Sequence, residues 1–254
     1  MKLKLNFIFS CGYRCLSTDV LKNNNIRKMS CPFDYLFIDL ESVFKIINNN
    51  FENFLNDIII YNKNENKNEL IYKKNYIETD NNLNLLENVS YMKECYNNNT
   101  LLFNKNYTYF KIKDKKTMDL YEFESICEFH HHDITNDNVY EKMKIKIDRF
   151  INILKKDYSI AMLYITRILK IENINVYINN ILILKKKYNI NYYLIIVVNC
   201  DNLEDQHYLC DNNLFIIKKV KSYEIQTLTN LTDNIDSYYN EFNIIQKYFT
   251  FDLI

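Results

Sequence analysis

The sequence predicts an α/β fold in which a central, mostly parallel sheet is flanked by helices, and three observations support this prediction. Apolar runs typical of buried strands alternate with helical periodicity through the second half of the chain. Near the start, a strand pattern, a turn and a helix pattern follow one another. Hydrophobic residues make up 48% of the 254 residues, which allows a large core without disulfides or metal. We expect a single domain over residues 1–254.

The second half of the chain carries the most regular pattern. Apolar residues recur every three or four positions in the predicted helices, and the predicted strands are short unbroken apolar runs. The helix that ends in three lysines places positive charge where it complements the helix dipole. Such alternation favours a parallel sheet covered on both faces. The predicted elements are the helices 140–154, 174–187 and 238–249 and the strands 160–168, 192–198 and 214–220.

The first half is less regular. Leu3, Leu5, Phe7 and Phe9 alternate with polar residues or isoleucine and predict a strand. Asparagine and lysine dominate a long stretch with weak apolar periodicity, which we interpret as a polar excursion outside the core. The predicted segments are a strand over 2–9, a helix from 15–19 to 23–25, a helix over 43–58, the excursion at about 62–106, and a strand over 107–112.

The composition singles out one region. The chain has one glycine, one proline, no tryptophan, and four arginines against 28 lysines, so residues with G/C-rich codons are scarce, as in an A/T-rich genome such as that of a large DNA virus. A depleted residue that survives such drift marks a position where its chemistry is needed. Seven of these residues or cysteines fall close together: Cys11, Gly12, Arg14, Cys15, Arg27, Cys31 and Pro32.

Charge and composition exclude several classes of function. The net charge is zero, so we expect neither nucleic acid nor a membrane surface as a partner. A single glycine cannot form a phosphate-binding or dinucleotide-binding loop, and we expect no cofactor and no metal. Seven cysteines at irregular spacing, with no signal sequence, favour free thiols in a reduced cytoplasm, or host cytoplasm if the source is viral. The oligomeric state stays open.

The first candidate site is the turn Ser10–Cys15 between the predicted strand and helix. Gly12 allows a positive φ or a close backbone approach that other residues adopt only at a cost. Cys15 would stand at a helix N-terminus, where unpaired N–H groups and the helix dipole lower a thiol pKa, and Arg14 adds positive charge. The alternative is that Cys15 is a small buried hydrophobic residue and Gly12 only closes a turn.

The second candidate site is the run Cys127–Asp133, which holds three of the four histidines. If 125–129 is a strand, His130 and His132 share one face and His131 points to the other. An imidazole close to a cysteine thiol is the arrangement of nucleophilic thiol catalysis. A solvated histidine loop and a zinc site made by Cys127, His130 and His132 are the alternatives, although no C-x-x-C pair accompanies them.

Taken together, these motifs resemble the papain-like cysteine peptidase family of unknown function found in bacteria and large DNA viruses. The resemblance covers about residues 5–200 and implies a papain-like fold, Cys15 as nucleophile and His131 or His132 as general base. No glutamine precedes Cys15, so backbone N–H groups at the helix start would hold the oxyanion. The residues that carry the resemblance are Ser10, Gly12, Cys15, Arg27, Pro32-Phe33-Asp34-Tyr35, Phe51, Phe54, His131-His132-Asp133 and Arg149-Phe150.

These observations give one hypothesis and two alternatives. The hypothesis is a cysteine hydrolase or acyl transferase that uses Cys15 and His132 on an amide or ester of an unidentified peptide or other acyl substrate. Asp34, Asn199 and Asp201 are open candidates for the residue that orients the histidine. The first alternative is a non-enzymatic interaction protein. The second is a different α/β enzyme acting on sugars or nucleotides, with Asp34 and the histidine run as its polar centre.

Overall fold

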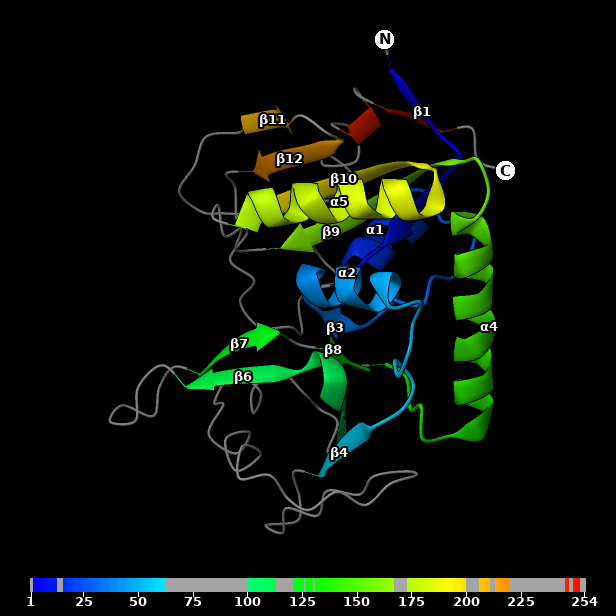
Figure 1. Cartoon of the computed structure of the whole chain (residues 1–254), viewed down its shortest axis with the longest axis vertical. Coiled ribbons are helices and arrows are strands. Elements are labelled where there is room, and N and C mark those ends of the chain that lie inside the picture. The colour runs from blue at the N-terminus through cyan, green and yellow to red at the C-terminus, as the bar shows by residue number, and fades with distance from the viewer. Residues whose placement is uncertain are drawn as a thin grey trace. The chain divides into compact units, whose positions relative to one another are not determined.

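A computed structural model describes most of the chain and divides it into two compact units. Unit 1 comprises Met1–Asp34 and Ile145–Ile254, and unit 2 comprises Tyr35–Lys144. The predicted fold class is confirmed, because helices and a mostly parallel sheet occur together (Figure 1). The single domain stays a prediction. The described residues are 2–12, 16–62, 100–112, 121–125, 127–129, 131–166, 173–199, 206–210, 213–219, 245–246 and 249–251.

Unit 1 is built around a five-stranded sheet. Its strands are β2 (Phe7–Ser10), β9 (Ser159–Thr166), β10 (Asn191–Asn199), β11 (Gln206–Cys210) and β12 (Leu214–Lys219). The strand order is β11-β12-β10-β9-β2, in which only β11 runs antiparallel to its neighbour. The three strands predicted in the second half are confirmed as β9, β10 and β12, and β11 was not predicted.

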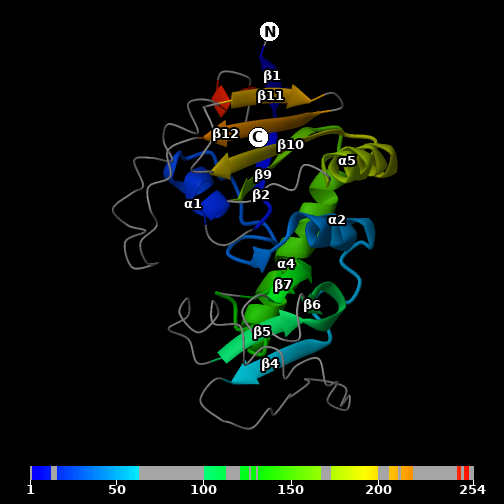
Figure 2. The same ribbon diagram turned by 90° about the vertical axis from the view of Figure 1, so that its left-hand side faces the viewer.

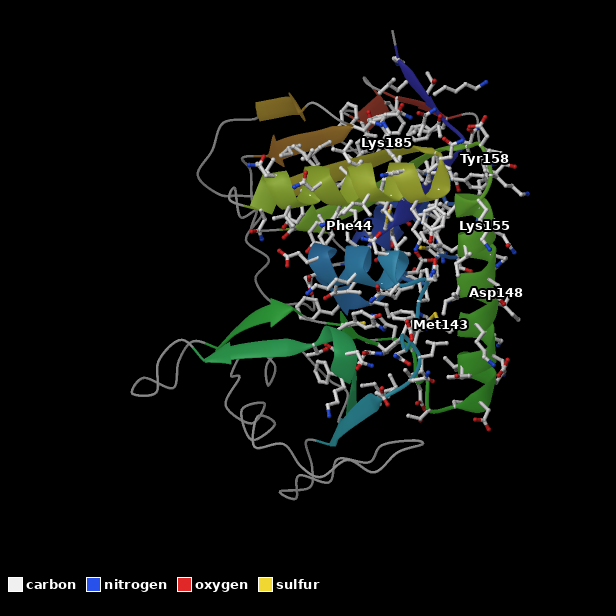
Figure 3. All side chains as sticks on the ribbon, viewed as in Figure 1. Phe44, Met143, Asp148, Lys155, Tyr158 and Lys185 are labelled. Carbon is white, nitrogen blue, oxygen red and sulfur yellow. The ribbon has the colours of Figure 1, made fainter. Side chains whose placement is uncertain are left out.

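Helices cover both faces of this sheet because successive strand residues point to opposite sides. The helices are α1 (Leu16–Asn23), α4 (Asp137–Leu154, in unit 1 from Ile145) and α5 (Ile174–Tyr188). Ile8 of β2 packs in one apolar cluster with Val20 of α1, whereas the ring of the next residue, Phe9, lies 5.0 Å from that of Phe150 on α4. Figure 2 shows α1 and α5 on opposite sides of the sheet. Lys185 stands in the last turn of α5, as predicted (Figure 3).

The predicted strand over 2–9 divides into two strands at Asn6. The Asn6 N–H donates to the Ser159 carbonyl at 2.8 Å, and its side-chain oxygen accepts from the Ser159 N–H at 2.9 Å. The chain thereby passes from β1 (Leu3–Leu5) to β2, and β1 pairs in parallel with β13 (Phe249–Phe251). The helix predicted over 238–249 is therefore wrong at residue 249, which lies in a strand. Of its other residues, only 245–246 are described, and they are helical.

The described part of unit 2 holds a four-stranded antiparallel sheet, a separate strand pair, the helix α2 and the first part of α4, up to Lys144. The sheet order is β3-β8-β5-β4, and β6 pairs with β7. The elements are β3 (Phe37–Ile38), α2 (Leu40–Asn48), β4 (Ile58–Asn62), β5 (Thr100–Asn104), the 3-10 helix η2 (Lys105–Tyr107), β6 (Tyr109–Ile112), β7 (Tyr121–Ser125) and β8 (Cys127–Glu128). The strand predicted over 107–112 is confirmed as β6.

Two predictions in unit 2 need correction. The helix predicted over 43–58 ends at Asn48, and the chain continues in turns with positive φ at Asn50 and Phe51 before Ile58 begins β4. Phe51 is buried within these turns, so the apolar spacing persisted without a helix. The excursion predicted at about 62–106 ends in β5, whose Phe103 is fully buried. Residues 63–99 lie outside the described residues.

None of the helices in the described ranges combines the length and the apolar character that crossing a membrane requires.

Candidate functional site

The strand–turn–helix elbow predicted at the start of the chain is present in unit 1. Gly12 follows β2 and has a φ of 93°, a left-handed conformation that is strained for residues with a Cβ atom. Tyr13, Arg14 and Cys15 lie outside the described residues, and α1 begins at the next residue, Leu16. The predicted position of this helix is confirmed. Cys15 therefore immediately precedes the N-terminus of α1 in the sequence.

Ser17 fastens the start of α1 to the sheet and to the glycine turn. Its fully buried hydroxyl donates to the Gly12 carbonyl at 3.2 Å and accepts from the Ile165 N–H of β9 at 3.1 Å. A hydroxyl can serve as donor and acceptor at once. One side chain thus joins the elbow to the carboxyl end of the neighbouring parallel strand.

Asp34 forms the centre of a buried polar network in unit 1. Its Oδ1 accepts from the Ser10 hydroxyl at 3.0 Å and from the Thr18 hydroxyl at 3.5 Å. Its Oδ2 accepts from Arg27 Nε at 3.2 Å, from Arg27 Nη2 at 2.5 Å and from the Cys31 N–H at 2.7 Å. The Ser10 and Thr18 hydroxyls also lie 2.8 Å apart. The carboxylate therefore connects the end of β2, the first turn of α1 and the loop that follows α1.

Further cations of α4 face the loop that carries Asp34. Arg149 Nη2 donates to the Ser30 hydroxyl at 3.1 Å. Lys146 is half-buried, and this burial lowers the pKa of its ammonium group, whereas Asp34 and Cys31 act in the opposite direction. The ion pair of Arg27 and Asp34 thus lies in a locally cationic environment.

The cysteines whose side chains the structure describes lack the features of a nucleophile. Cys11, Cys31 and Cys127 are buried, and loss of solvation raises the pKa of each thiol well above its ordinary value. The Cys11 thiol donates to the Leu163 carbonyl at 3.2 Å, which suits a protonated thiol. Each of the three behaves as a small core residue.

The histidine run lies in unit 2, after a strand that is shorter than predicted. β8 ends at Glu128, so the strand over 125–129 on which the division of the histidine faces depended does not extend to the histidines, and His130 lies outside the described residues. His131 is exposed, and its ring lies edge-on to Tyr35 with centroids 5.8 Å apart. Tyr35 has a φ of 61°, an unusual conformation for a bulky residue. His132 is half-buried and its N–H donates to the Phe129 carbonyl at 3.2 Å.

The remaining predicted residues lie in a local turn, at a strand end or outside the described residues. Asp133 Oδ1 closes a local turn by accepting from the N–H and the hydroxyl of Thr135, at 3.1 and 2.5 Å. Asn199 ends β10, and Asp201 lies outside the described residues, as does His130. In the described part of the chain, no group of three histidine, cysteine or acidic residues could hold a metal ion. The zinc set of Cys127, His130 and His132 is not tested by this, because His130 lies outside the described residues.

The structure brings into contact residues that the sequence motif named one by one. It pairs Arg27 with Asp34 in unit 1 and places Tyr35 against His131 in unit 2. Sequence reasoning missed that Thr18 contacts Asp34, because nothing in their spacing indicates that they meet. For the ion pair with Asp34, one signal was present in the sequence, because Arg27 is retained in a chain where lysine outnumbers arginine seven to one.

Comparison with known proteins gives one match. The sequence matches the family described as "Putative papain-like cysteine peptidase (DUF1796)" over residues 6–202. A search of the curated proteins and a search of the solved structures each find no match. The matched region includes the elbow, Asp34 and the histidine run, in agreement with the resemblance noted from the sequence. Because the match spans more than half of the chain, the chain belongs to the DUF1796 family.

Proposed function

We propose that the protein is a cysteine hydrolase of the papain-like type, a peptidase or acyl transferase, with Cys15 as its nucleophile. The observation that carries this proposal is the glycine turn with a φ of 93°, followed by a helix that begins one residue after Cys15. Unpaired N–H groups and the dipole at a helix start favour a thiolate over a thiol. Family membership supports the same chemistry.

The proposed reaction is acyl transfer through a thioester. The Cys15 thiol gives its proton to an imidazole, and the sulfur attacks the carbonyl carbon of an amide or ester. Backbone N–H groups at the start of α1 hold the oxyanion of the tetrahedral intermediate. The imidazolium then protonates the leaving amine or alcohol, the C–N or C–O bond breaks, and a thioester remains. Water, or an acceptor nucleophile in a transferase, releases the acyl group and restores the thiol.

The described thiols favour Cys15 by contrast. Cys11 is four residues away, yet it is fully buried and burial raises its thiol pKa. Cys31 is buried beside Asp34, whose negative charge raises its thiol pKa further. A nucleophilic cysteine needs a partly exposed, electropositive position. A position immediately before a helix N-terminus offers the electrostatic part of that requirement.

We propose His132 as the general base and His131 as its alternative. The two imidazoles differ in environment, because His131 is exposed and contacts Tyr35, whereas His132 is half-buried. Removing the true base lowers the rate at which the thiol is acylated by roughly 10²–10⁴-fold. His132→Ala and His131→Ala therefore form a matched pair, of which one abolishes most acylation and the other changes it little.

The first experiment measures thiol reactivity in the reduced, folded protein. Iodoacetamide is added at pH 6 to 7, and the modified residues are mapped by mass spectrometry over time. We expect Cys15 to react faster than Cys95 and Cys200, and the buried thiol Cys11 to stay unmodified until the protein unfolds. If Cys15 reacts no faster than Cys95 or Cys200, the proposed nucleophile is wrong.

The second experiment measures thioester formation directly. The protein is incubated with activated esters and a peptide library, and acylation is detected as a mass increase on the peptide that contains Cys15. We expect Cys15→Ala to abolish acylation, and Cys11→Ala to retain it. Retained acylation and hydrolysis in Cys15→Ala would contradict the proposal and favour a site centred on other residues.

A further inference from the structure

We propose that the Arg27–Asp34 ion pair is a positioning device that fixes the first turn of α1, acting through the hydroxyls of Thr18 and Ser10. This inference rests on the proposed function in one respect, namely that the first turn of α1 serves to present Cys15 as the nucleophile. It gives Asp34 a different part from that of a third catalytic residue.

Asp34 is already fully engaged as a hydrogen-bond acceptor. Four donors from Ser10, Arg27 and Cys31 reach its two oxygens at 2.5 to 3.2 Å. The Thr18 hydroxyl lies 3.5 Å from Oδ1 and 2.8 Å from the Ser10 hydroxyl, and it has one proton to donate to either of them. A carboxylate has about four lone-pair positions, so these donors occupy its capacity to accept. The side chain of Asp34 is 2% exposed, and that of Arg27 is 21% exposed. Asp34 therefore acts through the groups that it holds.

The groups held by Asp34 lie on both sides of the elbow. Ser10 is the last residue of β2, and Thr18 is the third residue of α1. Between them stands Gly12, which has no side chain that could restrict the turn from within. Asp34 accepts a hydrogen bond from the Ser10 hydroxyl, and the Thr18 hydroxyl contacts both Asp34 and Ser10, so this cluster supplies that restriction from outside. Arg27, four residues after the end of α1, holds the carboxylate in turn.

The charge of Asp34 allows a test based on the direction in which the Cys15 thiol pKa changes. The charged groups that face it are Arg27, in the loop after α1, and Lys146 of α4, with Arg149 beside Lys146. If Asp34 acted on Cys15 only through its charge, removal of that charge would lower the Cys15 thiol pKa. If it positions the helix start, removal loosens the N–H groups that favour the thiolate, and the thiol pKa rises.

Substitution of Thr18 tests the positioning role, because it leaves the Arg27–Asp34 ion pair in place. Thr18→Val keeps the size of the side chain and removes the hydroxyl, whereas Thr18→Ser keeps the hydroxyl. The iodoacetamide rate at Cys15 is measured from pH 5 to 9 in both variants. We expect Thr18→Val to raise the apparent thiol pKa by about one unit, which lowers the rate roughly tenfold at pH values well below that pKa and less above it. We expect the iodoacetamide rate of Thr18→Ser to stay within about twofold of the wild-type rate, because the hydroxyl is retained.

Two controls separate positioning from general loss of stability. Asp39→Asn weakens the N-cap of α2 in unit 2, where Asp39 accepts from the Ser42 N–H at 2.8 Å. Glu141→Gln breaks an exposed ion pair of α4 with Lys144. Neither change touches the elbow, so neither should alter the pH profile of Cys15. Asp34→Asn should raise the thiol pKa in the same direction as Thr18→Val.

The outcomes distinguish failure of this inference from failure of the proposed function. Hydrogen exchange of the α1 amides is measured beside alkylation, and we expect it to accelerate in Thr18→Val and in Asp34→Asn. Unchanged exchange and an unchanged profile in both variants would overturn the positioning role, as would a lowered thiol pKa in Asp34→Asn. Faster exchange together with an ordinary thiol pKa in the wild type would retain the positioning role and refute the nucleophile.

Discussion

Buried thiols in this protein serve as core side chains, and their environment explains why. Cys11 follows β2, is fully buried, and its thiol donates to the Leu163 carbonyl of β9. It therefore fills the place of a small core side chain at the edge of the parallel sheet. Cys31 and Cys127 are also fully desolvated. A thiolate in such a place would lose its hydration, and at Cys31 this loss outweighs the attraction of Lys146, so the protonated form is retained.

This retention predicts a loss of stability in alkaline solution. In the unfolded chain, the Cys11 thiol ionises near its ordinary pKa of 9.0, whereas burial raises its pKa well above that value in the folded protein. Above pH 9 the folded state binds more protons than the unfolded state, so the free energy of unfolding falls as pH rises. Each buried thiol adds a slope of up to about 1.4 kcal/mol per pH unit.

The measurement is urea unfolding between pH 8 and 10 in reducing buffer. Cys11→Ala and Cys127→Ala should each show a shallower decline with pH than the wild type, after subtraction of their offset at pH 7. Equal slopes in the wild type and both variants would mean that these thiols ionise alike in the folded and unfolded states.

Single residues were predictable from the sequence where their local chemistry has no substitute. The scarcity of glycine singled out Gly12, and its φ of 93° confirms the predicted need for conformational freedom. The partners of Asp34 were not predictable. Thr18 and Asp34 are 16 residues apart in different segments, and a hydrogen bond across such a loop leaves no periodic signal.

At the scale of elements, the turns after α2 show how one side chain can supply hydrogen bonds that a helix would otherwise provide to its carbonyls. The chain between Asn48 and Ile58 has positive φ at four residues, which leaves several carbonyls without helical partners. The buried side-chain amide of Asn104 donates to the carbonyls of Asn53, Phe54 and Asn56 at 2.8 to 3.1 Å. The two N–H groups of this amide therefore serve three carbonyls of the preceding turns, with one N–H shared between two of them.

We expect Asn104→Ala to destabilise the protein by roughly 1–3 kcal/mol, because it removes the side-chain donor to three carbonyls, of which that of Phe54 is buried. Asn106→Ala is the matched control, since its amide only reaches Asp57 at 3.1 Å on the surface and its loss should cost less than about 0.5 kcal/mol. Both values come from the midpoint of urea unfolding. A similar, small loss in both variants would show that the turns do not depend on Asn104.

Elements were predictable where burial repeats regularly along one helix or strand. The periodicity of α4 and α5 predicted both helices to within a few residues, because each buries one continuous stripe. The same spacing misplaced the end of α2, because Phe51 and Phe54 stay buried in consecutive turns. Periodicity reports which residues are buried, and it does not distinguish a helix from turns that bury the same residues.

At the scale of the whole molecule, β9 and β10 form the most enclosed part of the described sheet. β9 lies between β2 and β10, and β10 lies between β9 and β12. Residues 160–166 of β9 and 194–197 of β10 are buried. Exchange of their amides with solvent therefore requires the largest opening of unit 1.

Hydrogen exchange followed by mass spectrometry should rank these strands. We expect peptides from β9 and β10 to exchange slowest among those of unit 1, and peptides from β11 at the sheet edge to exchange at least about tenfold faster, because an edge strand opens with less loss of contact. Faster exchange in β9 than in β11 would contradict the observed strand order as the basis of stability in unit 1.

The class of the fold was predictable and its long-range pairing was not. Alternating strands and helices in the second half indicated a parallel sheet, and that sheet is present. The pairing of Leu3–Leu5 with Phe249–Phe251 joins segments from opposite ends of the chain, and neither segment carries a mark of its partner. The candidate site follows the same rule, since the elbow is local in sequence and its fastening by Asp34 and Ile165 is not.

The attachment of β2 to β9 also has a bearing on the order of events during translation. β2 leaves the ribosome early, yet its partner strand β9 is synthesised about 150 residues later, as the separation of 152 between Cys11 and Leu163 indicates. At rates of roughly 5–20 residues per second, the nascent chain spends about 8 to 30 seconds without that partner. The elbow therefore matures late, and a chain released before β9 would carry the Cys15 thiol without the scaffold that presents it.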